Sequence, residues 1–150
     1  DFQGSLYSKV LWDDGTRDQV NAYLGKRQMH SRVIADGQNI GGMYQKQFLS
    51  EKDKYAVFFG GNYGRTEVDT GNQTGKHLLI IKDSFANAFA PLAAEDFDRI
   101  CLVDLRYFSG NLDDYVKRNH ITDVLILYSM SDMIKDKNIS VLRSGGNILS

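Results

Sequence analysis

Ser84 combines the residue type and the sequence position that are best suited to chemistry in this chain. It follows Asp83 directly after the apolar run 77–82, and a helix-like segment follows it. The hydroxyl is therefore expected at the carboxyl edge of a sheet, where a helix start favours negative charge. This setting suits a nucleophile whose tetrahedral intermediate carries an oxyanion. The alternative is that Ser84 caps the helix, which is the common role of serine at such a position.

Arg106 is a candidate for holding an anionic group next to Ser84. It follows the second apolar run, 99–105, and would lie beside the serine if the first two strands are neighbours. A guanidinium there could bind a carboxylate or a developing oxyanion. A salt bridge to Asp83 or Asp104 is the alternative.

Asn62 is a second candidate for oxyanion stabilisation. It lies in the glycine-rich loop 60–64, which follows a short apolar run. Its side-chain amide could donate to the oxyanion, although the loop by itself favours a turn with positive φ. Ser129 follows the third apolar run, 123–128, and its hydroxyl could contact a sugar or a carbonyl. Helix capping is the alternative for the serines of that segment.

The three histidines offer no well-placed base for Ser84. His77 begins the first apolar run and His120 precedes the third, so both are expected at the amino edge of the sheet, roughly 20 Å from Ser84. His30 lies in the first half of the chain, where no pattern supports a catalytic role. A serine nucleophile needs a base, so the base lies outside this sequence or the chain is not catalytic.

The elements that would position these residues are clearest in the second half. The runs 77–82, 99–105 and 123–128 are typical of strands buried on both faces, and the segments 84–96 and 112–119 are helix-like, with Pro91 breaking the first. This β-α-β-α-β order predicts an α/β fold with a three-layer parallel sheet, flavodoxin-like and incomplete. Ligands of such sheets bind at the carboxyl ends of the strands.

The first half has weaker patterns. A short helix is expected over about 17–27, a strand over 31–35 and a helical turn over 50–57, opened by a Ser50-x-x-Asp53 capping pattern. We divide the chain into an irregular glycine-rich region, 1–65, and a β-α-β-α-β core, 76–150.

Composition excludes several function classes. The chain has 150 residues, 18 Lys and Arg against 19 Asp and Glu, and a net charge of -1, so no basic surface points to nucleic acid. Cys101 is the single cysteine and is expected to be a buried apolar residue. We predict no cofactor and no metal site, because the histidines lack ligand spacing. The chain begins with Asp1 and not Met, so we expect a piece of a longer protein.

Several motifs resemble the DHHW family of bacterial envelope proteins. They are GSLYSK at 4–9, DKYAVFFGGN at 53–62, LLIIKDSFAN at 78–87, VDLRYF at 103–108 and ITDVLILY at 121–128. The family is similar to SGNH-type hydrolases and to alginate O-acetyltransferase-like proteins. The Asp-His-His-Trp motif that names the family is absent here, and the only tryptophan, Trp12, has no preceding histidine.

The resemblance implies an SGNH-like α/β domain of which this chain is the C-terminal part. It implies that Ser84 is the nucleophile of the intact protein, supported by Arg106 and Asn62, and that an upstream Asp-His pair supplies the base. Tyr107 and Asn87 lie inside the matched motifs and are predicted, with Ser129, to bind substrate. The implied function is removal or transfer of acyl groups, acetyl above all, on a polysaccharide of the bacterial envelope or outside the cell.

Two further expectations remain open. The chain could instead be a non-catalytic module with the same fold that binds glycan or a partner. An incomplete sheet exposes an edge strand, so we also expect self-association, besides contact with the upstream part of the same protein. A flavodoxin-like or receiver-like domain is disfavoured, because no phosphate-binding loop follows the first strand.

Overall fold

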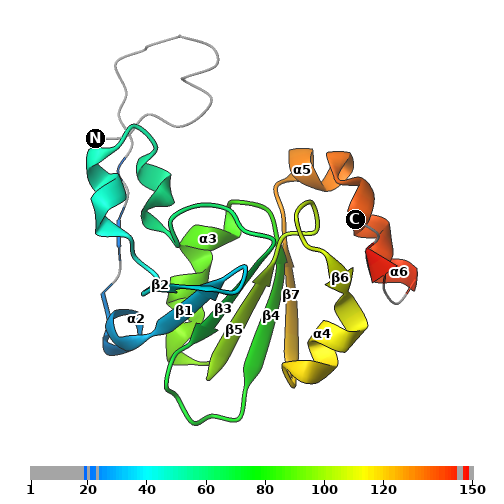
Figure 1. Ribbon diagram of the computed structural model, residues 1–150, viewed down its shortest axis with the longest axis horizontal. Helices are drawn as coiled ribbons and strands as arrows, with labels where there is room; N and C mark the ends of the chain where they lie inside the picture. Colours follow the sequence, from blue (N-terminus) through cyan, green and yellow to red (C-terminus); the bar gives the residue numbers. More distant parts are fainter. Residues whose placement is uncertain (1–18, 20, 23, 145–146, 149–150) are drawn as a thin grey trace.

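The computed structural model describes residues 19, 21–22, 24–144 and 147–148 (Figure 1). In chain order the strands are β1 (Arg32–Ala35), β2 (Gln38–Gly41), β3 (Arg65–Asp69), β4 (His77–Lys82), β5 (Arg99–Val103), β6 (Gly110–Asn111), β7 (Asp123–Leu127) and β8 (Asn147–Ile148). The α-helices are α2 (Lys26–His30), α3 (Ala86–Phe89), α4 (Leu112–Arg118), α5 (Met130–Lys135) and α6 (Val141–Ser144). The 3-10 helices are η1 (Lys46–Ser50), η2 (Lys54–Val57), η3 (Ala90–Glu95) and η4 (Lys137–Ser140).

The main sheet has six strands in the order β2-β1-β3-β5-β4-β7. The three strands predicted from the apolar runs are neighbours, and β4 pairs in parallel with both β5 and β7. The other pairings, β3 with β5, β1 with β3 and β1 with β2, are antiparallel. The α/β class is therefore confirmed, but the prediction of a parallel sheet is wrong: the sheet is mixed and mostly antiparallel. Short hairpin-like connections in the glycine-rich half make the antiparallel pairs possible.

Both faces of the central strand β4 are buried, as its unbroken apolar sequence predicts. Leu78 and Ile80 belong to a core cluster with α3 and η3, whereas Leu79 and Ile81 belong to a second cluster with α4. The helices α3 and α4 accordingly lie on opposite sides of the sheet in Figure 1. Cys101 of β5 is fully buried, as predicted, and burial raises the pKa of its thiol to about 11.

The first half of the chain is more regular than its sequence predicts. The strand expected at 31–35 is present as β1, and Asp36 and Gly37, both with positive φ, turn the chain into β2. The helix expected over about 17–27 is wrong where it can be compared, because α2 spans Lys26–His30 and begins near the predicted end. GSLYSK and Trp12 lie outside the described residues.

The helical turn expected over 50–57 is η2, but its predicted cap is wrong. The carboxylate of Asp53 accepts a hydrogen bond from the Tyr55 backbone N–H at 3.2 Å, so Asp53 is the N-cap. The Ser50 hydroxyl instead donates to the Gln47 carbonyl, in the preceding helix η1.

The helices of the second half follow their sequence signals closely. Pro91 lies in the first turn of η3, so the helix predicted over 84–96 is a short α3 followed by a 3-10 helix. The predicted cap of α4 is confirmed, because Asn111 Oδ1 accepts from the Asp114 N–H at 2.9 Å. In the part of the chain that the structure describes, no helix is long and apolar enough to cross a membrane.

Candidate functional site

Ser84 lies two residues beyond the end of β4, at the carboxyl end of the parallel strands. It is half-buried and stands in a turn between β4 and α3. Among the described residues, no group forms a hydrogen bond with the Ser84 hydroxyl or accepts one from its backbone N–H. The site therefore presents a hydroxyl and a main-chain donor that are not used within the fold.

The alternative role of Ser84 as a helix cap is wrong. The helix α3 has Phe85 at its N-cap position and no side-chain cap bond. The fully buried carboxylate of Asp83 takes over the local turn, because it accepts from the Phe85 N–H at 2.9 Å and from the Ser129 N–H at 2.7 Å. The helix also has only four residues, so its dipole contributes little to an oxyanion.

The turn that holds Ser84 is fixed from a second side by Tyr55 of η2. The Tyr55 hydroxyl donates to the Ser84 carbonyl at 2.8 Å and accepts from the Ala88 N–H at 3.3 Å. Burial raises the pKa of Tyr55, so the hydroxyl stays protonated. Sequence analysis missed Tyr55, since a lone tyrosine 29 residues away carries no local signal.

Two predicted residues, Asn62 and Asn87, meet beside Ser84. The Asn87 amide Nδ2 donates to Asn62 Oδ1 at 3.1 Å and to the Gly61 carbonyl at 3.2 Å. The Asn87 backbone N–H donates to the Ser84 carbonyl at 3.2 Å. Because Asn62 accepts through its oxygen, its own Nδ2 group remains free to donate to an anion. Asn87 is buried and Asn62 is exposed, so Asn87 orients Asn62 at the surface.

The glycine loop needs Gly64 to reach this position. A Cβ on Gly64 would lie 2.5 Å from the Tyr107 carbonyl oxygen, so only glycine fits there. The Gly64 carbonyl also accepts from the Asp104 N–H at 3.1 Å. The loop that carries Asn62 is thereby attached to the segment that follows β5.

Arg106 is held mainly by the buried carboxylate of Asp104. Its Nε and Nη2 donate to the two Asp104 oxygens at 2.8 and 2.7 Å, and Nη1 donates to Asp132 at 3.1 Å. The hydrogen bonds to Asp104 raise the pKa of Arg106. The salt-bridge alternative is thus present, with Asp104 as the partner. The guanidinium lies 5.5 Å from the centroid of the Tyr107 ring, which is exposed.

Lys82, which sequence analysis did not select, is buried under this network. Its side chain is 1% exposed, its Nζ makes no hydrogen bond among the described residues, and Asp104 Oδ2 lies 3.9 Å away. Burial lowers the pKa of Lys82 to about 8, against the opposing effect of Asp104. A lysine at the end of an apolar strand resembles an ordinary strand terminus in sequence, so its burial could not be predicted.

Ser129 lies at the same sheet edge, but its hydroxyl is used within the fold. Its oxygen accepts from the Asp132 N–H at 3.2 Å and caps α5. The cap alternative therefore applies to Ser129. The structure thus brings Ser84, Asn62 and Asn87 together, whereas Arg106 and Tyr107 form a separate stacked pair after β5.

The described histidines are not at this site. His77 is the first residue of β4, at the opposite end from Ser84, and its Nδ1 lies 2.7 Å from the Asn119 carbonyl. His120 follows α4, and the exposed His30 contacts the Lys26 carbonyl at 2.8 Å. Within the described residues, no group of three or more His, Cys, Asp or Glu side chains could hold a metal ion.

Comparison with known proteins gives structural neighbours only. No protein-family model and no curated protein matches the chain. A DHHW family protein from Eubacterium siraeum DSM 15702 has a TM-score of 0.66 and 27% sequence identity, and the match covers 81% of this chain and 41% of that chain. The resemblance seen in the motifs is thus matched by a structural neighbour of the same family.

PatB1 from Bacillus cereus is similar as well. Its structure with a sulfonyl adduct has a TM-score of 0.60 and 27% identity, and a second PatB1 structure has a TM-score of 0.59 and 26% identity. Both matches cover 71% of this chain, but only 38% and 37% of the PatB1 chains. This chain spans less than half the length of the structures that it matches.

Proposed function

We propose that this chain carries the nucleophile of an SGNH-like active site that acts on acyl esters of polysaccharide. Ser84 Oγ attacks the acyl carbonyl carbon, and the Ser84 proton passes to a base. The Ser84 N–H and the Asn62 Nδ2 group donate to the oxyanion, in the manner of other acyl-transfer sites. The ester bond then breaks, which leaves an acyl-serine for water or a sugar hydroxyl to attack.

The observation that carries the proposal is the state of Ser84. A helix cap would use the hydroxyl within the fold, but Asp83 satisfies the turn and leaves the hydroxyl without a partner among the described residues. The sulfonyl adduct of PatB1 supports the same conclusion, since nucleophilic side chains form such adducts. The neighbours and the motifs support an acetyl ester as the substrate and a location in the bacterial envelope or outside the cell.

The base is proposed to come from chain outside the described residues, because none of the described histidines lies at the Ser84 end of β4. Arg106 is proposed to hold the substrate through the N–H groups that Asp104 and Asp132 leave free, with the Tyr107 ring beside it. Asn87 is proposed to orient Asn62.

The second candidate is a non-catalytic module that binds glycan, and the lack of a described base beside Ser84 favours it. The test is hydrolysis of p-nitrophenyl acetate and of an acetylated glycan by the product of the complete reading frame that contains these residues. We expect turnover that Ser84→Ala abolishes and that Ser50→Ala, at an exposed serine of η1, leaves unchanged. Glycan binding without turnover in either protein would favour the module.

A further inference from the structure

The strand β7 has an unusual surface for the edge of a sheet. It is the last strand in the order, and its outer edge pairs with no strand among the described residues. Val124 and Ile126 are 60% and 50% exposed, and the half-buried Leu125 faces the other side of the sheet. Parallel strands with apolar residues on both faces are normally covered, and a bare apolar edge invites pairing with another strand.

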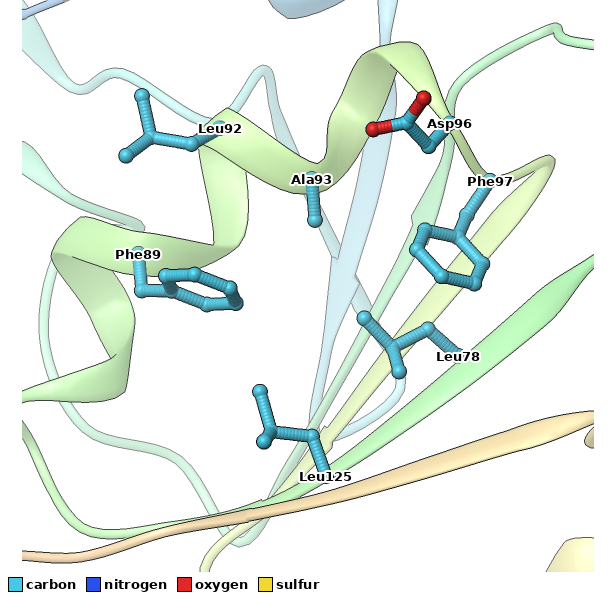
Figure 2. A pocket seen from close by; sticks show the side chains of 7 residues that line it. All are labelled: Leu78, Phe89, Leu92, Ala93, Asp96, Phe97 and Leu125. Carbon is cyan, nitrogen blue, oxygen red and sulfur yellow. The ribbon is translucent and has the colours of Figure 1, made fainter.

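An apolar groove adjoins β7 on the α3 side of the sheet. Figure 2 shows Leu78 and Leu125 from the sheet facing Phe89, Leu92 and Ala93 from α3 and η3. The groove has a volume of about 350 Å³ and Asp96 is the one charged residue that lines it. Phe89 and Leu92 are 38% and 47% exposed, so the groove is open to further apolar side chains.

The helix α5 extends this surface beyond the end of β7. Met130, Met133 and Ile134 are 74%, 47% and 78% exposed. Their spacing of three and four residues places them on one face of the helix. Apolar residues thus follow one another along the chain from β7 into α5, which exceeds the isolated exposed residues of an ordinary surface.

We propose that a further segment of the same polypeptide covers this surface, adds a strand to the free edge of β7 and fills the groove with an apolar side chain. The lengths of the structural neighbours point to this occupant over a second copy. The match covers 81% of this chain but 41% of the DHHW family protein, so more than half of that protein lies outside the matched part. The PatB1 structures show the same disproportion.

The location of the surface has a consequence for the site, which rests on the proposed function. The edge of β7 ends next to Ser129, whose N–H donates to Asp83 at 2.7 Å, one residue before Ser84. A segment added along β7 therefore arrives beside the nucleophile, where it can supply the base.

Hydrogen exchange of the β7 amides in the product of the complete reading frame tests the proposal without reference to activity. In a parallel edge strand, only alternate amides pair with the neighbouring strand. We expect all β7 amides to be protected in a monomeric protein, with mass checked by light scattering. Rapid exchange of the outward-facing amides, or a reading frame that encodes no further segment, would overturn the proposal. A dimer whose dissociation exposes these amides would identify a second copy as the occupant, which also overturns it.

Ile126→Lys in the same protein provides an independent readout. We expect the variant to lower Tm by about 5 °C or more, because the charge would be buried beneath the added segment. Leu49→Lys is the matched control, since Leu49 is 46% exposed in η1, and it should shift Tm by about 1 °C or less. Equal effects of the two substitutions would contradict the proposal. This result does not depend on Ser84 being a nucleophile, so the two proposals can fail separately.

Discussion

Replacing Lys82 with methionine should stabilise the fold at neutral pH. The fall of the Lys82 pKa from 10.5 to about 8 means that the folded protein holds the ammonium charged at a cost. At about 1.4 kcal/mol per pKa unit, this cost is about 3 kcal/mol. Methionine has a similar apolar stem and no charge, and Asp104 keeps its paired hydrogen bonds to Arg106, so no buried carboxylate is left without a partner.

The pH dependence of the effect distinguishes this cause from better packing. Because the folded pKa lies below that of the unfolded chain, the unfolded state binds more protons between pH 8 and pH 10.5, and wild-type stability rises with pH there. The advantage of Lys82→Met should therefore be about 3 kcal/mol at pH 7 and about 1 kcal/mol at pH 10. Urea unfolding at both pH values measures it, with the exposed Lys76→Met as control. A variant less stable than wild type at pH 7, or a gap that does not narrow with pH, would refute the reasoning.

Three further substitutions test the neighbouring contacts. Gly64→Ala should lower the free energy of unfolding by about 2 kcal/mol in urea titrations, because its Cβ would overlap the Tyr107 carbonyl, and an unchanged midpoint would count against that contact. Asp104→Asn should destabilise by about 3 kcal/mol or more in the same assay, since it leaves Arg106 without its paired carboxylate. Asn62→Ala should lower the rate of ester turnover about 100-fold with little change in Tm, and a rate close to wild type would remove Asn62 from the oxyanion site.

The sequence predicted the parallel core of the fold because its strands are locally unambiguous. The run 77–82 is apolar at nearly every position, so only a strand buried on both faces suits it, and the caps of the following helices are short-range signals. The antiparallel strands β1, β2 and β3 were harder to place. Their pairing depends on turns such as Asp36-Gly37, and on contacts between distant segments, which leave no periodic pattern.

For the candidate site, the sequence indicated which residues meet but not how they are held. Ser84 and Asn87 belong to one turn, and the glycine loop with Asn62 joins them through a side-chain hydrogen bond across 25 residues. The roles of Lys82, Asp83 and Tyr55 depend on burial and on partners far along the chain, so residue type and spacing did not reveal them.

The central claim is that Ser84 is an activated nucleophile in the complete protein. The most direct measurement is the intact mass of the complete reading-frame product after exposure to a fluorophosphonate probe, with Ser84→Ala treated in parallel. The account predicts one covalent adduct on the wild-type protein, mapped by peptide mass to Ser84, and none on the variant. An adduct that persists in Ser84→Ala, or an unmodified wild-type protein that also turns over no ester, would contradict it.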